Sequence, residues 1–202
     1  FFNRLVKDNT VYHGLAGHFF LQDISHVMKV RIIANIEERI REEMIRENCS
    51  ADEARYTLKK KDEERRKWGM HLYGKDTWDS RLYDMVLHID TMTVDGAVAI
   101  IEQTINNGIF KATAESLEKM KMRTLLAAIQ AKIVTISPCA TVDVSDGVVM
   151  LGNLEGDLKD DDNIRNEIRD SILRSHDVKD VIYEETRSRR VHVNPFYYMD
   201  HY

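Results

Sequence analysis

Val27–Ala34 reads VMKVRIIA and Tyr83–Asp90 reads YDMVLHID, and these two apolar runs decide the fold together with the charged stretch between them. Both runs are rich in β-branched or large apolar residues, which favour buried strands. The charged stretch begins as NIEERIREE at Asn35–Glu43 and continues through KDEERR at Lys61–Arg66, a composition typical of helices. Strands that alternate with helices predict a parallel α/β sheet.

Helix start signals divide the charged stretch into two helices. Asn35 lies three residues before Glu38, and Ser50 lies three residues before Glu53. Each pair predicts a capping box, in which the two side chains satisfy each other's free backbone N–H groups. A third helix is predicted over Thr93–Asn106, whose apolar residues fall on one face.

A different pattern follows after residue 111, with the order helix, strand, strand, helix, strand. Asp146–Gly147 lies between two apolar runs, and this dipeptide is the strongest short-range signal for a β-hairpin. The acidic run Asp160–Asp162 predicts a helix-capping turn rather than a calcium loop, because it lacks the ligand spacing of an EF-hand. The predicted elements cover residues 117–133, 141–144, 148–151, 164–172 and 178–183.

The amino-acid composition limits the classes of protein to which the chain can belong. The chain has 202 residues, 43% of them hydrophobic and 31% charged, which predicts a soluble, helix-rich globular protein with one sizeable core or two small ones. A net charge of -5 argues against a nucleic-acid partner. No apolar run is long enough for a membrane span, so a cytoplasmic location is expected.

The metal-binding and redox-active residue types are sparse. Cys49 and Cys139 are far apart and predict reduced thiols rather than a disulfide or a zinc site. His13 and His18 are five residues apart, and core or surface roles are favoured over a metal pair. We expect no metal site in this chain.

Gly69–Asp76 reads GMHLYGKD and fits the phosphate-loop pattern GxxxxGK except at its last position. A phosphate loop needs a strand before it and a helix after it, so that free N–H groups face the phosphate. A charged helix precedes this segment instead, and Asp76 stands where a hydroxyl should bind Mg²⁺. The segment is therefore interpreted as a loop at the tip of a lid.

Residues 5 to 106 resemble the C-terminal part of the cytidylate kinase-like family. The resemblance rests on the charged helices, on Asp62-Glu63-Glu64-Arg65 as an Asp-x-x-Arg motif, and on the closing apolar strand. It implies a partial kinase-like parallel sheet with a helical lid, in which Arg39, Arg41 and Arg65 face nucleotide phosphates and Asp62 holds the nucleoside or orients Arg65. A planar guanidinium suits this role because it can bind two phosphate oxygens at once.

An alternative explanation of these arginines is helix stabilisation. The spacing allows the pairs Glu37–Arg41, Glu38–Arg39 and Asp62–Arg66. Such pairs stabilise a helix by only about 0.2–0.5 kcal/mol each. Both explanations stay open for each arginine.

The chain departs from the family pattern at two points. No strand with a glycine-rich phosphate loop precedes the matching region, and ATP and Mg²⁺ are therefore expected only if a segment upstream of Phe1 supplies that loop. Members of the family have an arginine at the end of a strand where this chain has Leu15, after a short strand predicted at Thr10–Tyr12. No catalytic residue is assigned, and whether the chain is an enzyme stays open.

The C-terminal segment resembles a BON domain. VDVSDGVVMLG at Val142–Gly152 and DVKDV at Asp177–Val181 carry the resemblance, together with the α-β-β-α-β order of this small α+β domain. The expected organisation is a kinase-like segment over 1–111, a BON-like domain over 112–190 and an aromatic tail over 191–202.

These observations predict a nucleotide-binding protein of the cytidylate kinase-like type, inactive as this chain, with a BON-like module that senses a ligand or partner. The expected partner is a nucleotide or another small anionic ligand. The alternative is a non-catalytic scaffold or dimerisation protein built on a degenerate kinase fold. A homodimer is compatible with both interpretations.

Overall fold

The computed structural model describes residues 1–7 and 9–184, so the predicted aromatic tail over 191–202 lies outside the described residues. The chain forms two compact units. The central unit is Tyr12–Ser116, and the terminal unit combines Phe1–Val11 with the chain from Leu117 onward. The domain limits expected at residues 111 and 190 stay predictions. Among the described residues, no helix combines the length and apolar character that crossing a membrane requires.

The central unit contains the predicted parallel sheet. Strand β1 (Val30–Ala34) pairs in parallel with β2 (Met85–Ile89), with Ile32 opposite Leu87. Within the described residues this sheet has two strands. Helix α5 (Val94–Asn106) follows β2 and contacts it. The prediction of a parallel α/β arrangement is therefore confirmed.

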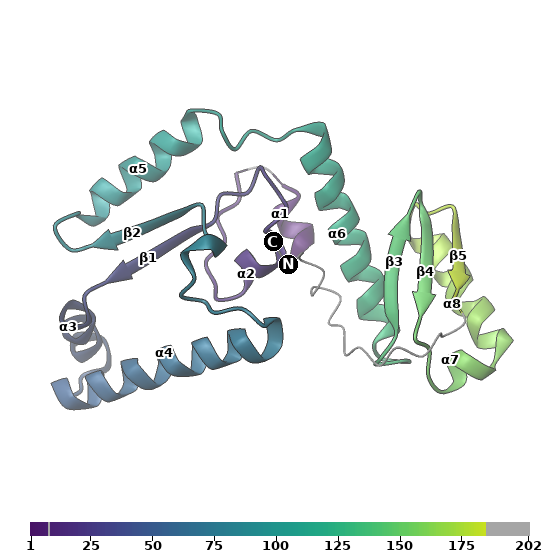
Figure 1. Ribbon diagram of the computed structural model, residues 1–202, viewed down its shortest axis with the longest axis horizontal. Helices are drawn as coiled ribbons and strands as arrows, with labels where there is room; N and C mark the ends of the chain where they lie inside the picture. The colour runs from purple at the N-terminus through teal and green to yellow at the C-terminus, as the bar shows by residue number, and fades with distance from the viewer. Residues whose placement is uncertain (8, 185–202) are drawn as a thin grey trace. The chain divides into compact units, whose positions relative to one another are not determined.

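The two charged helices form a hairpin between the strands. Helix α3 (Ile36–Glu47) follows β1 directly and lies beyond its carboxyl end, and the longer α4 (Ala51–Tyr73) packs against it after a short turn (Figure 1). Their shared core is small, because its buried residues are Ile40, Ala54 and Leu58. Charged side chains cover most of the remaining surface of the hairpin, which leaves them available for polar contacts.

The capping predictions for these helices had different outcomes. Ser50 and Glu53 form the predicted capping box at the start of α4. Asn35 is the N-cap residue of α3, but its side chain makes no capping hydrogen bond. Its Oδ1 atom instead lies 3.0 Å from Nε2 of His88, on the neighbouring strand. The prediction of a capping pair between Asn35 and Glu38 was wrong, because a tertiary partner competes for the asparagine.

The N-terminal residues form short helices, α1 (Phe2–Leu5) and α2 (Gly17–Phe20), and a short 3₁₀ helix, η1 (Ser80–Leu82), precedes β2. The strand predicted at Thr10–Tyr12 is absent from the described structure. Val11 is 96% exposed, so its β-branched side chain has no sheet to pack against. A single short strand without a neighbouring strand gains no ladder of hydrogen bonds, which explains the difference.

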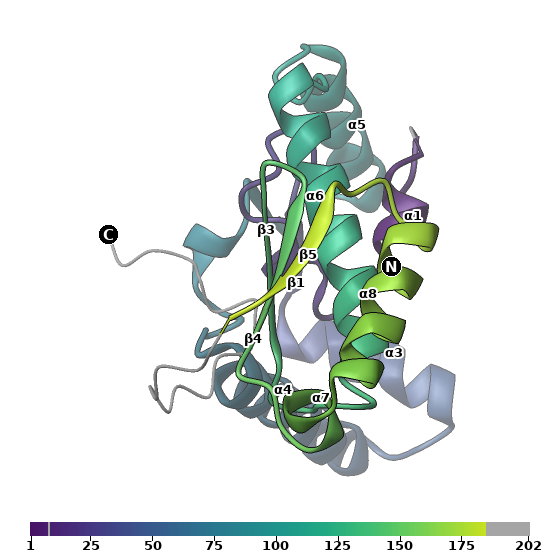
Figure 2. The ribbon, with the colours of Figure 1, turned by 90° about the vertical axis from the view of Figure 1, so that its right-hand side faces the viewer.

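The terminal unit has the predicted order of helices and strands, with one additional short helix, α7 (Asp157–Asp160). Strand β4 lies in the middle of the sheet, antiparallel to β3 and parallel to β5. Helices α6 and α8 lie on the same side of this sheet (Figure 2). The remaining elements are α6 (Ala114–Ile133), β3 (Thr141–Ser145), β4 (Val148–Gly152), α8 (Asp162–Ser175) and β5 (Asp180–Tyr183).

Two local predictions are confirmed in this unit. Asp146 and Gly147 form the hairpin turn with φ angles of 51° and 82°, the positive values that a type I′ turn requires. Asp161 caps α8, because its side chain accepts hydrogen bonds from the backbone N–H groups of Asn163 and Ile164. The acidic run is thus a capping turn.

Candidate functional site

The α3–α4 hairpin brings oppositely charged side chains together across its two helices. Arg39 donates from both terminal nitrogens to the two carboxylate oxygens of Asp62, at 2.6 and 2.9 Å. This bidentate pair joins residues 23 positions apart in the sequence. The hydrogen bonds that Arg39 donates to Asp62 raise the pKa of Arg39, and partial burial opposes that effect. The result is a charge-assisted fork of the kind that carboxylates and phosphates both accept.

A buried carboxylate lies deeper in the same hairpin. The Glu43 side chain is 3% exposed and accepts a hydrogen bond from Lys61 at 3.1 Å, with Arg46 as a second partner. The Lys61 hydrogen bond and the charges of both cations lower the pKa of Glu43, although burial opposes them. Sequence reasoning missed Glu43. The sequence feature that could have indicated its burial is its position on the apolar side of α3, next to Met44 and three residues after Ile40.

The other predicted site residues lie apart from this fork. Arg41 pairs with Glu38 on its own helix and is exposed. Arg65 is exposed on α4 and makes no hydrogen bond or ion pair with the rest of the described chain. The structure therefore brings Arg39 and Asp62 together and leaves Arg65 free for a ligand from solution.

The helix-stabilising pairs that the spacing allowed are not formed among the described residues. Glu37 pairs with Arg55 across the hairpin, at 3.0 Å, rather than with Arg41. Asp62 is taken by Arg39 rather than by Arg66. The long charged side chains reach across to the neighbouring helix because the thin apolar core holds the two helices close together.

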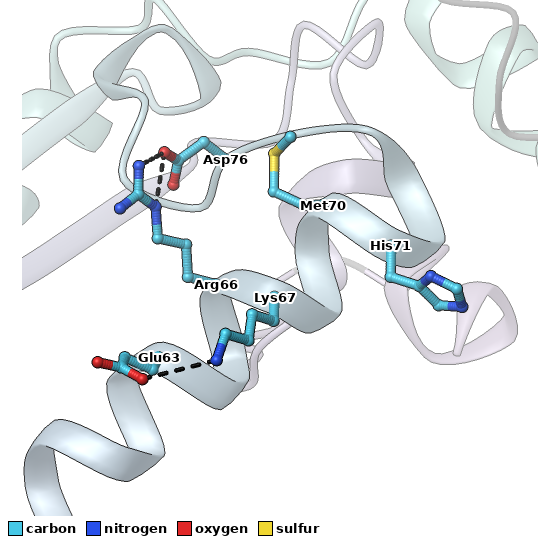
Figure 3. Close-up of a pocket in the computed structure, with 6 residues that line it drawn as sticks. All are labelled: Glu63, Arg66, Lys67, Met70, His71 and Asp76. Atoms are coloured by element: carbon cyan, nitrogen blue, oxygen red, sulfur yellow. Dashed lines mark hydrogen bonds and ion pairs between the residues drawn. The ribbon is translucent and has the colours of Figure 1, made fainter.

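A shallow groove of about 810 Å³ lies along the C-terminal half of α4 and the loop that follows it (Figure 3). On one side Arg66 donates two hydrogen bonds to Asp76, at 2.8 and 2.6 Å, and its guanidinium lies 4.8 Å from the centre of the Trp78 ring. The Arg66 hydrogen bond lowers the pKa of Asp76. On the other side Lys67 pairs with Glu63. Each of these two cations thus has an internal acidic partner.

The GxxxxGK segment lies at the wrong end of a helix for binding phosphate. Gly69 is buried within α4, and Gly74 is the C-cap residue of that helix with a φ angle of 62°. A helix C-terminus presents carbonyl oxygens and partial negative charge, which repel an anion. The residues in this segment do not fit the phosphates of ATP. The interpretation of this segment as a loop at the tip of the lid was wrong, because Gly69–Tyr73 belong to α4 and the segment lies at the opposite end of that helix from the α3–α4 turn.

An aromatic cluster fixes the loop between α4 and β2. The rings of His18 and Tyr83 stack with centroids 4.8 Å apart, and the Tyr83 hydroxyl donates to the carbonyl of Thr77 at 3.0 Å. Burial, with a further contribution from the charge of Arg31, lowers the pKa of His18 to about 4. The imidazole is therefore neutral at pH 7. Among the described residues, no three His, Cys, Asp or Glu side chains are grouped as a metal site needs.

Comparisons with known proteins agree with the resemblance of the N-terminal segment. The sequence model of the cytidylate kinase-like family matches residues 2–91. The chain is 30% identical over 99 residues to a cytidylate kinase of Thermococcus kodakarensis, a match that covers 49% of this chain and 50% of that protein. The match thus spans about half the length of this curated relative. No solved structure matches the chain. The resemblance of the C-terminal segment to a BON domain stays a prediction.

Proposed function

We propose that the kinase-like segment binds a nucleotide through the α3–α4 hairpin, which acts as a lid. Arg39, Arg41 and Arg65 are the residues that contact phosphate in this proposal, and Asp62 is the acidic partner of Arg39. The observation that carries it is the position of an arginine-rich helical hairpin directly after a parallel strand, within the part of the chain that matches the family.

The location of the hairpin supports this proposal on general grounds. In open parallel sheets, ligands bind outside the carboxyl ends of the strands. Asn35 follows the last residue of β1, and its contact with His88 joins the two strands near that end. The hairpin starts there, so its arginines are carried on helices that extend from the edge of the sheet where a ligand is expected.

We infer that this chain, as given, does not transfer phosphate from ATP to CMP. Phosphoryl transfer depends on backbone N–H groups and cations that position the donor phosphates and stabilise charge. The one segment with a matching glycine pattern lies at a helix C-terminus. In addition, the chain has Leu15 at the position where the family resemblance places an arginine near the acceptor phosphate. ATP and Mg²⁺ enter the proposal only if an upstream segment supplies a phosphate loop.

The proposed role of the terminal unit is to sense a ligand or partner, as a BON-like module. Support comes from its order of helices and strands, which is the order on which the resemblance rests. A cytoplasmic location remains part of this proposal.

Titration calorimetry with CMP tests the nucleotide site. Arg65→Ala is expected to weaken CMP binding by about 10- to 100-fold, because a charge-assisted hydrogen bond to phosphate contributes about 1.5–3 kcal/mol. Lys75→Ala is the control and should leave the affinity unchanged, since this lysine follows the C-terminal end of α4, where backbone carbonyl groups disfavour a phosphate. A strong loss of affinity in the lysine variant alone would overturn the assignment. Sustained turnover in a coupled kinase assay would overturn the claim of inactivity.

The second candidate function, a non-catalytic scaffold, has one observation in its favour. Apolar side chains of the central unit are exposed: Ile32 on β1 is 60% exposed, and Ile105 on α5 is 53% exposed. Parallel sheets are usually covered on both faces, so such residues suit an interface. Sedimentation equilibrium tests this candidate. If the chain is a monomer at all concentrations and binds CMP, the scaffold candidate is excluded and only the nucleotide-binding proposal stands.

A further inference from the structure

We propose that Asp62 is an internal competitor for phosphate at Arg39, so that the fork between them acts as a latch that the ligand must displace. This inference rests on the proposed function, because it concerns the same lid. It assigns to Asp62 a role that differs from holding the nucleoside or orienting Arg65.

The geometry of the fork makes the two states exclusive on the guanidinium edge that the two terminal nitrogens form. Both terminal nitrogens of Arg39 donate to Asp62, and both oxygens of that carboxylate are used. A phosphate that binds the guanidinium in the same bidentate way needs the same two nitrogens. Arg39 therefore cannot hold Asp62 and a bidentate phosphate through these atoms at one time.

The fork is accessible enough to be exchanged. The Arg39 and Asp62 side chains are 31% and 25% exposed, so solvent reaches both partners. Water screens such a pair and stabilises either partner after separation, in contrast to a fully buried pair. A phosphate with a charge near -2 attracts Arg39 more strongly than a single carboxylate does. Competition from the Asp62 carboxylate therefore lowers the net free energy of phosphate binding at Arg39, but it does not prevent the phosphate from replacing the carboxylate.

The hairpin does not depend on the latch to stay closed. Glu37–Arg55 and Glu43–Lys61 also join α3 to α4, and the apolar core lies between the helices. Loss of the Arg39–Asp62 pair is therefore expected to free the guanidinium while the two helices remain together. This separates the latch from a merely structural ion pair.

The variant Asp62→Asn tests the latch, because it keeps the shape of the side chain and removes its charge. Calorimetric titrations use CMP and inorganic pyrophosphate as separate probes. Both probes are expected to bind about tenfold more tightly to Asp62→Asn than to the unsubstituted chain. The gain should disappear when Arg39→Gln is added to the same variant, since the freed guanidinium is its source.

Glu37→Gln is the matched control, because it breaks a different ion pair between the same two helices. It should leave the affinity for both probes unchanged, and a gain equal to that of Asp62→Asn would overturn the latch by showing general loosening. Circular dichroism verifies folding of each variant, and Asp62→Ser replaces Asp62→Asn if the latter unfolds.

The remaining outcomes separate the latch from the proposed function. Unchanged or weaker binding by the Asp62 variant overturns the latch, while sensitivity of CMP binding to Arg65→Ala keeps the nucleotide site. Tighter pyrophosphate binding without any CMP binding supports the latch and overturns the nucleotide site. Absence of binding by every variant overturns both.

Discussion

At the scale of single residues, the backbone conformation of Gly147 sets the tip of the terminal hairpin. Its φ angle of 82° lies in the left-handed region, which glycine adopts without strain. Its carbonyl accepts a hydrogen bond at 2.7 Å from the backbone N–H of Lys179, just before β5. The turn therefore helps to fix the start of the third strand as well as the hairpin.

Gly147→Val is expected to lower the free energy of unfolding by about 1–3 kcal/mol, because a β-branched residue is strained at this φ angle. The new Cβ atom would also lie 3.3 Å from Cγ of Lys179. Urea denaturation measures the loss. Gly147→Asn is the control and should cost less, since asparagine tolerates the left-handed region. Equal stability of the valine variant and the unsubstituted chain would contradict the turn geometry.

His18 is a second residue with a measurable consequence, because its folded-state pKa of about 4 lies below the ordinary value of 6.5. Well above pH 6.5 the imidazole is neutral in both states and has no pH-dependent effect. As the pH falls from 6.5 to 4, the unfolded chain takes up the proton first, so stability is lost. Screening of this half-buried ring reduces the loss to about 1–2 kcal/mol.

Comparison of the unsubstituted chain with His18→Gln isolates this effect from the titration of carboxylates. The difference in unfolding free energy between pH 7 and pH 4.5 should be smaller in the variant. Identical pH dependence in the two proteins would show that His18 has an ordinary pKa. NMR titration of the imidazole gives an independent measurement of the same quantity.

At the scale of helices and strands, the α3–α4 hairpin depends on polar contacts at the helix ends and along the interface between the two helices. The capping box at Ser50 starts α4, and the cross-helix ion pairs supplement a core of three buried apolar residues. A hairpin with so little apolar core relies more than usual on its caps. Local opening of such an element costs less free energy than global unfolding.

Ser50→Ala should destabilise the hairpin by about 1 kcal/mol, because the N-terminal N–H groups of α4 lose their side-chain acceptor. Amide hydrogen exchange of α4 detects the faster opening. Ser50→Asp is the matched control, since aspartate is an equally good N-cap, and exchange should stay near the original rate. Unchanged exchange in the alanine variant would mean that the ion pairs alone maintain the helix.

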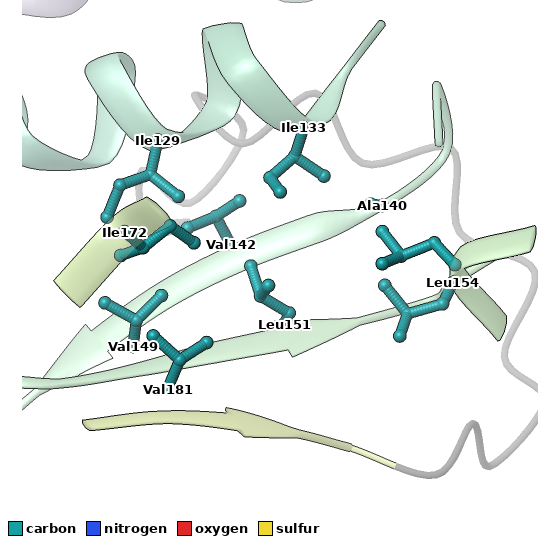
Figure 4. Packing of buried hydrophobic residues seen from close by; sticks show 10 residues of the cluster. Ile129, Ile133, Ala140, Val142, Val149, Leu151, Leu154, Ile172 and Val181 are labelled. Carbon is teal, nitrogen blue, oxygen red and sulfur yellow. The ribbon is translucent and has the colours of Figure 1, made fainter. Parts of the chain in front are cut away.

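At the scale of the whole molecule, the terminal unit has a continuous hydrophobic core of its own. Figure 4 shows side chains from α6, α8 and the three strands converging on one interior. The members that are almost completely buried are Ile129, Ile133, Val149, Leu151, Leu158 and Ile172. All of them lie within residues 112–190, the segment for which a BON-like domain was predicted.

A fragment of residues 112–190 is therefore expected to fold alone and to unfold cooperatively. A dispersed amide NMR spectrum and a single thermal transition would verify this. Leu151→Ala in the same fragment should remove about 2–5 kcal/mol, since it leaves a cavity in a fully buried site. A collapsed amide spectrum of the unsubstituted fragment would show that this segment needs the rest of the chain.

The sequence by itself determined those features whose causes are local. The periodicity of apolar residues predicted the two parallel strands and the order of elements in the terminal unit. The Asp146–Gly147 turn and the Ser50–Glu53 capping box were also predicted correctly, because their atoms interact within three residues. The match to the cytidylate kinase-like family over residues 2–91 agrees with the motif that suggested it.

Only the tertiary structure decided the partners of the long polar side chains. Arg39 pairs with Asp62 and Asn35 contacts His88, although helix spacing and capping rules favoured nearer partners for each. The burial of Glu43 likewise depends on the second helix of the hairpin. The physical reason is reach: a flexible charged side chain selects among neighbours on several elements, and packing of the apolar residues determines which neighbours are close.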